Sequence, residues 1–391
     1  MILKTSVKKC NGLAEAFRKK KKKRKNYSES NHFEQIKNVQ SVKFTTRILK
    51  QNNEIINQKQ PIIICISLLN LKKIDLIQII LLLHMVRCFF ICSLIFLFSS
   101  CLKDKVSYKK YNTAYCLVVV VDGARYSETW GDTSHQYIPL MHNYFKNLGV
   151  INTSFYNLGT TNTTNGHVAI TTGYYENNIN NSGQELPSYH SYFQDWLKKY
   201  PLLTNSAWII SSKDKLEVLG NCVQGKWKDI HQPKTDCGIN GNFTGYRSDS
   251  ITLAHAIKTL VKHKPNLLLI NLKDPDYYGH QNNWSAYLNA IKTSDNYIYH
   301  LWNTIQQDPE MAGKTTLFVT NDHGRHTSNF QNHGDDCDGC RHIMLYAIGP
   351  DFKKNIQISQ SRSLIDIHAT ISEMMHLPNF SQGKVMSELF E

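Results

Sequence analysis

The sequence predicts an α/β fold in which helices cover both faces of a mostly parallel central sheet, a three-layer αβα sandwich. From residue 115 onward, short runs of Val, Ile and Leu alternate with stretches whose apolar residues recur three or four positions apart. Several of the short runs are continuously apolar, which is typical of strands buried on both faces. A hydrophobic content of 41% is sufficient for a substantial core.

The predicted strands cover residues 115–121, 207–211, 266–272, 315–320 and 343–348. The helical period predicts helices over residues 250–262, 284–307 and 363–375. Neither pattern is present in residues 177–187 and 220–247, which are predicted to be loops. Because ligands of such a sheet gather at the carboxyl ends of its strands, the polar residues that follow each strand are the candidates for function.

The positive charge of the chain is concentrated near its beginning. The 391 residues include 45 Lys and Arg and 31 Asp and Glu, of which residues 1–84 hold 18 and 5. The remaining 27 basic and 26 acidic residues nearly cancel. No nucleic-acid partner is expected, because the basic run at 18–25 has no aromatic or base-reading residues beside it.

The first hundred residues predict export. Residues 1–84 are expected to be non-structured or mis-annotated sequence upstream of a second start at Met85. From there Arg87, an apolar stretch and small residues before Cys101 resemble a bacterial lipoprotein signal over residues 85–101, with Cys101 lipidated. The alternative is an uncleaved membrane anchor. Both place the domain at 102–391 outside the cytoplasm, membrane-anchored in the periplasm or at the cell surface.

The later cysteines agree with an oxidising compartment. Cys222 with Cys237, and Cys337 with Cys340, are predicted to form two local disulfides. Cys116 lies in an apolar strand and is expected to be a buried small hydrophobe.

A zinc knuckle is the alternative for the second cysteine pair. In that interpretation His333, Cys337, Cys340 and His342 would bind a structural zinc ion. The disulfide is favoured because an exported CxxC pair tends to oxidise. His326 is expected to bind no metal.

Asp and His residues follow three of the predicted strands. Asp122 follows the first strand, Asp276 and His280 follow the third, and Asp322 and His323 follow the fourth. A single Asp at such a place is most often a helix cap. Three strand ends with carboxylate and imidazole groups instead indicate the ligands of zinc, in numbers that could bind two ions.

A candidate nucleophile lies in the segment TTNTTNGHVAITTG, residues 160–173. Thr163 would stand at the amino end of a short helix, where the helix dipole and free N–H groups favour a phosphate group. A metal ion could deprotonate its hydroxyl to make a nucleophile. Taken alone, the segment favours the commoner role of Thr as a helix cap.

The order and spacing of these motifs resemble the alkaline phosphatase superfamily, especially its nucleotide pyrophosphatase/phosphodiesterase and phosphonoacetate hydrolase branch. The resemblance runs from Tyr115 to the C-terminus, and it includes Thr163 ten residues before Gly173 and the final segment SLIDIHATISEMMHLP. It implies an alkaline phosphatase-like metallohydrolase domain over residues 102–391, with two zinc ions or other divalent metals and Thr163 as nucleophile.

The resemblance also implies which residues bind the two ions. The first set is Asp122, Thr163, Asp322 and His323. The second set is Asp276, His280 and one further histidine. His333 is favoured over His342 for that place, because a ligand that precedes Gly suits a tight loop at the edge of a site.

The expected reaction is in-line displacement on a small phosphate ester, of the phosphodiesterase or nucleotide pyrophosphatase type. Thr163 would form a phospho-threonine, which water then hydrolyses. Asn165-Gly166-His167 stands where the branch often has Pro-Asn, so the group that binds the substrate oxygens is assigned by rough position to Asn181, with Asn180 as the alternative. Arg125 could touch substrate or form a structural salt bridge.

Other functions are weighed against this one. A phosphomonoesterase and a phosphonate hydrolase stay open, because the loops that read the substrate cannot be aligned. A sulfatase is disfavoured, since no C/S-x-P-x-R segment lies near Thr163. The non-enzyme alternative is a surface lipoprotein that binds a glycan or a protein, and the seven filled ligand positions argue against it.

Overall fold

The computed structural model describes residues 81, 83–87 and 109–391 and divides the chain into two compact units, Met1–Val106 and Ser107–Glu391. The described residues of the first unit are helical and exposed. The predicted upstream region and the signal or anchor at 85–101 lie almost entirely outside the described residues. In the part that is described, no helix combines the length and apolar character needed to cross a membrane.

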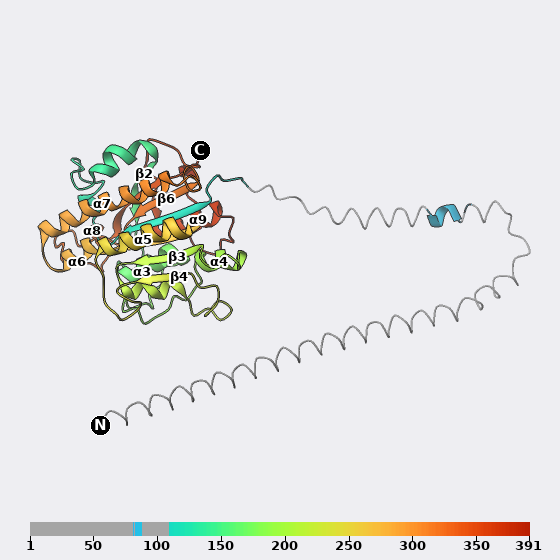
Figure 1. Cartoon of the computed structure of the whole chain (residues 1–391), viewed down its shortest axis with the longest axis horizontal. Coiled ribbons are helices and arrows are strands. Elements are labelled where there is room, and N and C mark those ends of the chain that lie inside the picture. The colour runs from blue at the N-terminus through green and yellow to red at the C-terminus, as the bar shows by residue number, and fades with distance from the viewer. Residues whose placement is uncertain (1–80, 82, 88–108) are drawn as a thin grey trace, which may run out of the picture. The chain divides into compact units, whose positions relative to one another are not determined.

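A mixed, mostly parallel sheet forms the centre of the second unit (Figure 1). Its strands are β1 (Tyr115–Val121), β2 (Val150–Tyr156), β3 (Ala207–Ser211), β4 (Lys234–Cys237), β5 (Leu267–Leu272), β6 (Thr315–Thr320), β7 (His342–Ile348), β8 (Ile356–Ile358) and β9 (Arg362–Ser363). They lie in the order β4-β3-β5-β1-β6-β7-β2-β8, and β9 pairs with β2. Only β7 runs antiparallel to its neighbours among these pairs.

Helices cover both faces of the sheet because side chains alternate along its buried strands. Cys116, Val118 and Val120 of β1 pack into a core with α3 (Thr163–Thr172), α4 (Tyr192–Lys199) and α9 (Leu364–Met374). Leu117 and Val119 face the opposite core, which contains α5 (Asp249–His263) and α7 (Trp284–Gln307). The predicted three-layer α/β fold is therefore confirmed.

Shorter elements complete the unit. They are η1 (Tyr126–Glu128), η2 (Met141–Phe145), η3 (Lys146–Leu148), η4 (Asp214–Gly220), α6 (Asp274–His280), α8 (Asp338–Arg341) and η5 (Ser387–Leu389).

All five predicted strands and all three predicted helices form, with ends that shift by one residue or less. The loop at 177–187 is also confirmed, whereas the loop at 220–247 contains the edge strand β4. The prediction omitted β2, in which a polar segment and a register shift between Asn152 and Phe155 interrupt the apolar pattern.

The strand register brings polar groups to one edge of the sheet. Val121 of β1 pairs with Leu272 of β5, and Val120 pairs with Thr320 of β6, so the three strands end nearly level. Because β7 runs in the reverse direction, it begins at the edge where β6 ends. The whole β6–β7 connection therefore stays at the edge of the sheet where β1, β5 and β6 end. A connection to a parallel strand would have to cross to the opposite edge.

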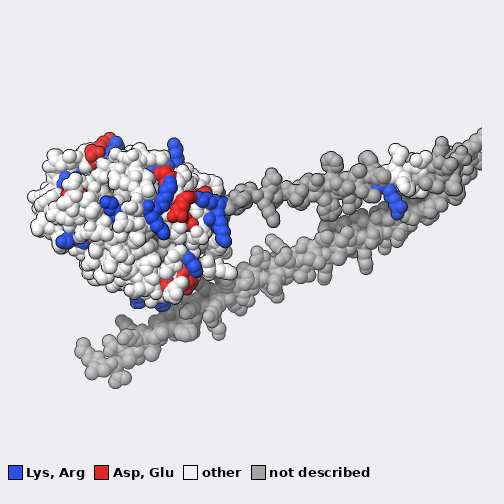
Figure 2. All heavy atoms as spheres, turned by 90° about the horizontal axis from the view of Figure 1, so that it is seen from above, with Lys and Arg blue, Asp and Glu red and all other residues white. Residues whose placement is uncertain are grey.

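The surface of the second unit carries both signs of charge. On the face seen in Figure 2, Lys and Arg side chains lie beside Asp and Glu side chains, and much of the surface is uncharged. This mixture agrees with the near balance of basic and acidic residues after residue 84.

The two predicted disulfides are wrong in this structure, in which Cys222, Cys237, Cys337 and Cys340 are free thiols. Cys237 ends β4, and its buried Sγ faces the backbone oxygen of Ile209 in β3 at 3.9 Å. The pairing of β4 with β3 thus holds Cys237 in the sheet. The short distance along the chain between Cys222 and Cys237 does not show this pairing. The prediction that Cys116 is a buried apolar residue is confirmed, since it is 1% exposed.

A buried histidine in α9 predicts a pH-dependent stability. His368 donates from Nδ1 to the Thr171 oxygen at 2.8 Å, and burial lowers the pKa of its imidazole to about 4. The unfolded chain binds this proton below about pH 6.5, so His368 contributes full stability above that pH and loses it as the pH falls towards 4.

We expect His368→Asn, which keeps an N–H donor near Thr171, to reduce the loss of unfolding free energy between about pH 7 and pH 5 by about 2 kcal/mol. Urea unfolding at both pH values measures this difference. The exposed His300 supplies the control substitution His300→Asn. An unchanged pH dependence in the His368 variant would contradict the assignment.

Candidate functional site

Asp122, Asp322 and His323 form one group of potential metal ligands at the ends of β1 and β6. Their donor atoms lie within 4.8 Å of one another, and all three side chains are buried. His323 Nε2 is 3.4 Å from Asp322 Oδ2 and 3.6 Å from Asp122 Oδ1. In the described structure neither His323 Nε2 nor Asp322 Oδ2 has a hydrogen-bond partner. Buried, unpartnered donors that converge on one place fit a bound cation.

Neighbouring groups hold these ligands in place. Asn271 Nδ2 donates to Asp122 Oδ2 at 2.9 Å, and Asn157 Nδ2 donates to the Asp322 backbone oxygen at 2.7 Å. Gly166 of α3 packs against Asp322 so closely that a side chain there would clash with its backbone. The Asn-Gly-His segment that departs from the family pattern therefore lets α3 approach this group.

Asp276, His280 and His333 form a second group, with donor atoms also within 4.8 Å of one another. The spacing of four residues places Asp276 and His280 on one side of α6. His280 Nε2 is 3.4 Å and His333 Nε2 is 3.5 Å from Asp276 Oδ1. His333 donates from Nδ1 to the Thr161 oxygen at 2.8 Å, which directs Nε2 into the group.

His342, the alternative to His333, lies elsewhere. It begins β7, where its ring stacks against Tyr126 and Tyr156 and its Nε2 donates to the Thr153 oxygen at 2.9 Å. The structure thus brings His333, and not His342, to Asp276 and His280.

Thr163 is the first residue of α3 and lies beside the first group. The N-cap of the helix is Asn162, so the interpretation of Thr163 as a cap is wrong. Thr163 is 1% exposed. Its hydroxyl accepts from Lys213 Nζ at 2.8 Å and lies 3.5 Å from Asp122 Oδ1. The hydroxyl is therefore free of the backbone role that a cap would give it.

Lys213 is a site residue that the sequence analysis missed. It follows β3 by two residues, and its buried ammonium group also donates to Asp122 at 2.9 Å and to Asp276 at 2.7 Å. Burial opposes its charge, but the two carboxylates outweigh this effect and raise its pKa. Lys213 lies at the carboxyl end of a strand, as the predicted ligands do, but a lysine is not a typical metal ligand and so gave no signal in the sequence.

Arg325 is a second missed residue, two positions after His323. Its guanidinium group is completely buried and pairs with Asp276, while it also donates to the backbone oxygens of Phe330 and Gln331. It packs on Gly279, where any side chain would collide with it. Arg325 therefore ties α6 to the loop that carries His333.

The two groups differ in their electrostatics. Burial opposes the charge of Asp276, but the cations Lys213 and Arg325 outweigh burial and hold its pKa well below the ordinary value. Burial and the charge of Asp122 raise the pKa of Asp322 well above its ordinary value. Crowded carboxylates of this kind call for additional positive charge, which a divalent cation would supply.

Burial also lowers the pKa of His333 to about 4 and moves that of His323 and His280 in the same direction. These imidazoles are therefore neutral near pH 7. A neutral imidazole has the lone pair that a metal ligand needs.

Asn181 lies at the amino end of α3. Its Oδ1 accepts from Thr164 N at 2.9 Å, Thr164 Oγ1 at 3.0 Å and Lys215 Nζ at 2.9 Å. These three bonds involve Oδ1 and do not use the amide N–H groups of Asn181. Asn180 is exposed and instead accepts from Ser182 N.

Arg125 forms the structural salt bridge that was the alternative to a substrate contact. Its Nε donates to Glu128 Oε2 at 2.7 Å, and its Nη1 donates to the His326 oxygen at 3.0 Å.

The predicted zinc knuckle does not form with the predicted histidines. Cys337 and Cys340 lie beside His326 and Asp335, while His333 and His342 occupy the other positions described above. His326, for which no metal was expected, therefore lies in a third group of potential ligands.

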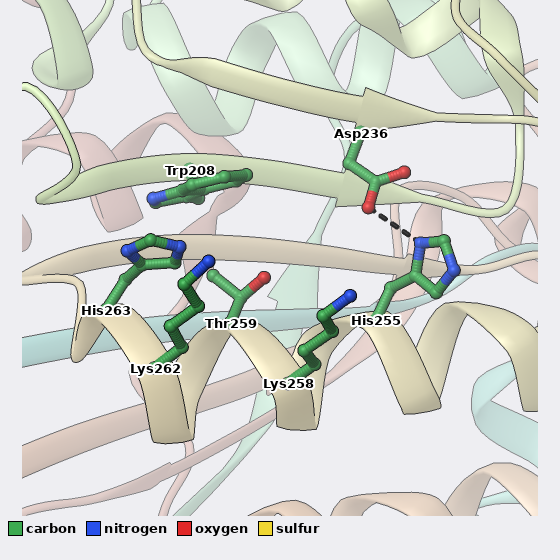
Figure 3. A pocket seen from close by; sticks show the side chains of 7 residues that line it. All are labelled: Trp208, Asp236, His255, Lys258, Thr259, Lys262 and His263. Carbon is green, nitrogen blue, oxygen red and sulfur yellow. Dashed lines mark hydrogen bonds and ion pairs between the residues drawn. The ribbon is translucent and has the colours of Figure 1, made fainter.

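A pocket outside these groups is shown in Figure 3. It lies between α5 and strands β3 and β4, where Asp236 pairs with His255 at 2.7 Å and Trp208 stacks on His263. None of the predicted ligands lines it.

Metal content provides a test of the third ligand. We expect His333→Ala to lower the affinity for a metal ion at the Asp276 group by roughly 10–100-fold or more, and His342→Ala to leave the metal content unchanged. Metal analysis after dialysis against graded zinc concentrations measures both. Loss of an ion from the His342 variant alone would reverse the assignment.

Comparison with known proteins adds the following relationships. Residues 116–379 match the model of the metalloenzyme superfamily. The chain is 28% identical over 134 residues to a phosphopentomutase of Carboxydothermus hydrogenoformans, covering 34% of this chain and 32% of that protein. It is 26% identical over 132 residues to a 2,3-bisphosphoglycerate-independent phosphoglycerate mutase of Gracilaria tenuistipitata var. liui, covering 33% and 25%. The match thus spans about a third or less of these curated relatives.

Solved structures share the fold. Murine ectonucleotide pyrophosphatase/phosphodiesterase 5 superposes with a TM-score of 0.53 at 14% identity, over 71% of this chain and 100% of that chain. A phosphonate monoester hydrolase of Agrobacterium radiobacter gives 0.52 at 13% identity, over 71% and 77%. The predicted resemblance to the alkaline phosphatase superfamily is confirmed, while identities this low speak for the fold alone.

Proposed function

This chain belongs to the metalloenzyme superfamily, which includes alkaline phosphatase-like enzymes, and on that premise we propose that it is a metal-dependent hydrolase of phosphate esters. The proposed type is a phosphodiesterase or nucleotide pyrophosphatase with Thr163 as nucleophile. One observation carries the proposal: the Thr163 hydroxyl, at the start of α3, contacts a lysine that also contacts a carboxylate of each ligand group.

The donor sets fit two divalent cations. Asp122, Thr163, Asp322 and His323 would hold one ion, and Asp276, His280 and His333 would hold the other. When bound, the ions supply Lewis-acid stabilisation of the phosphoryl oxygens and lower the pKa of a coordinated hydroxyl group. Zinc is the proposed metal, because mixed carboxylate and imidazole sets suit it.

In the proposed reaction, Thr163 Oγ1 attacks phosphorus as its proton passes to solvent. The bond from phosphorus to the leaving oxygen breaks, and that oxygen takes up a proton from solvent. Water then attacks the phospho-threonine, which releases the phosphate product and restores the hydroxyl. The Lys213 ammonium group, 2.8 Å from Oγ1, stabilises the developing negative charge at this atom.

Asn181 is proposed to bind a non-bridging phosphate oxygen. Its side chain is fixed through Oδ1, which accepts from Thr164 N and Lys215 Nζ. Burial and the charge of Lys213 lower the pKa of Lys215 to about 8. The amino end of α3 adds a favourable dipole for the anionic group.

A substrate panel tests the proposal on the purified full chain. It compares p-nitrophenyl phosphate, bis-p-nitrophenyl phosphate, a nucleotide-sugar and nitrophenyl sulfate, with and without a zinc chelator. The diester and the nucleotide-sugar are expected to be cleaved, with loss of activity on chelation and recovery with zinc. Absence of both phosphoester turnover and bound metal would refute the enzyme proposal and favour a binding protein.

A phosphomutase is the second candidate, because the sequence relatives named above are phosphopentomutases and a phosphoglycerate mutase. A mutase returns the phosphoryl group to a sugar or glycerate hydroxyl, whereas a hydrolase gives it to water. Phosphorus NMR with pentose phosphates and phosphoglycerates separates the two outcomes. Isomerisation without release of inorganic phosphate would replace the hydrolase proposal.

We also propose that the chain acts outside the cytoplasm as a membrane-anchored protein. The motif that ends at Cys101 supports lipidation. Cys101→Ala is expected to abolish incorporation of labelled fatty acid, and equal labelling of both proteins would refute a lipid on this residue.

A further inference from the structure

We propose that His326, Asp335, Cys337 and Cys340 bind a structural zinc ion, separate from the two groups at the reaction centre. The four donor atoms lie within 4.8 Å of one another. None of these residues belongs to the sets assigned to the proposed reaction, so this site stands independently of the proposed hydrolase activity.

The distances suit tetrahedral coordination. His326 Nδ1 is 3.6 Å from Cys337 Sγ, 3.5 Å from Cys340 Sγ and 3.0 Å from an oxygen of Asp335. With zinc–sulfur and zinc–nitrogen bonds of about 2.3 and 2.0 Å, tetrahedral ligands of these two kinds lie about 3.5 Å apart. Three groups thus face a single imidazole nitrogen, which has only one hydrogen-bonding position to offer them.

The chemistry of the set is that of a closed structural site. Two thiols, an imidazole and a carboxylate provide four ligands and leave no position for a substrate. Both cysteines are free thiols in the structure, and Cys340 is buried. Asp335 accepts from the Cys337 backbone through Oδ1, which turns its other oxygen towards His326.

The backbone holds the two halves of the site together. Gly324 N donates to the Cys340 oxygen at 2.8 Å, and Arg325 N donates to the Gly339 oxygen at 2.8 Å. The chains approach so closely that a side chain at Gly324 or Gly339 would strike the opposite backbone. His326 and the CxxC turn are therefore adjacent whether or not their side chains interact.

The position of the site gives it a role. His326 and Asp335 bracket the segment that carries His333, so an ion bound to them closes this loop at both ends. Within this loop His326 N already donates to the Asn332 oxygen at 2.8 Å, and Thr161 Oγ1 donates to the Asp335 oxygen at 2.9 Å. The zinc ion would add a direct link between the two ends of the segment and so make the position of His333 more rigid.

Cobalt substitution on the full chain tests the site. After reduction, metal removal and loading with Co²⁺, the wild type is expected to show thiolate-to-cobalt charge-transfer absorption. Cys337→Ser and Cys340→Ser should lose this band, while Cys222→Ser, which removes a free thiol outside the site, should retain it. Retention of the full band in both site variants would overturn the proposal.

Alkylation of the wild type decides the question even if the cysteine variants fold poorly. Zinc should slow alkylation of Cys337 and Cys340 by about tenfold or more, and a chelator should restore the rate. Peptide mass spectrometry resolves these two positions from the other cysteines. Equal alkylation rates of the reduced protein with and without zinc would refute the zinc site.

Discussion

Thr163→Ala is expected to lower kcat for every phosphate ester that the chain cleaves by roughly a thousandfold or more. The substitution removes the oxygen that forms the bond to phosphorus. Asp122, Asp322 and His323 remain as ligands, so the metal content should stay near that of the wild type. Stopped assays and metal analysis of the same preparation measure the two quantities.

Thr172→Ala is the matched control for this substitution. Thr172 is a buried threonine of the same helix, and its hydroxyl donates to the Val168 backbone oxygen. Its loss should reduce stability and leave kcat close to normal. If Thr163→Ala turned over at the wild-type rate, water would be the attacking group and Thr163 would have another role.

Lys213→Met is expected to have two large effects. In the metal-free protein it leaves the buried Asp122 and Asp276 without the ammonium group that pairs with both, and it should reduce the unfolding free energy by roughly 3–5 kcal/mol. Saturating zinc should shrink this difference, because the ions supply the missing positive charge. Turnover should fall by roughly 100–1000-fold, since the group that stabilises charge at Thr163 is gone.

The control is Lys264→Met, which removes a lysine that also pairs with two carboxylates, Asp308 and Glu310, but at the surface. Exposed pairs of this kind contribute little to stability, because solvent and salt screen them. Urea unfolding with and without chelator compares the variants. Equal stability losses for Lys213→Met in both conditions would contradict its role as a counter-charge for the ligand groups.

The fold was predictable because its central strands are apolar enough to be recognised without any knowledge of their partners. β1, β5 and β6 are continuously buried, and their ends carry the predicted Asp and His residues. Edge strands gave no such signal: β4 consists of KTDC, whose first three residues are not buried. Its place depends on pairing with β3, which is a tertiary property.

Strand direction was also absent from the sequence pattern. Residues 343–348 read as one more buried strand, and nothing in the run indicates that β7 is antiparallel. That reversal keeps Asp322, His323 and His333 on one connection at the active edge. The structure was needed to choose between His333 and His342. It shows that His342 is the first residue of β7, whereas His333 lies in the connection that precedes this strand.

The role of Lys213 could not be deduced from its neighbours in the sequence. Within SSKDK, Lys213 and Lys215 look alike, but one lies between Asp122 and Asp276 and the other contacts Asn181. The different contacts of the two lysines depend on burial and on the order of the strands in the sheet. Cys237 gives a similar case, because its place in β4 beside Ile209 of β3 could not be read from its distance along the chain to Cys222.

The close contact between Gly324 and Gly339 forms a neck in the connection between β6 and β7. It divides a buried part of this connection from an exposed tip. Residues 327–329 lie beyond this neck and are exposed, while Asp322 and His323 lie before it and are buried. Inserted or altered residues at the tip would leave Asp322 and His323 in place behind the neck, whereas His333 lies on the same loop as the tip and depends on its bond to the Thr161 oxygen for its position. A change in the length of this loop would therefore act on the ligand group of His333 and spare the group of Asp322 and His323.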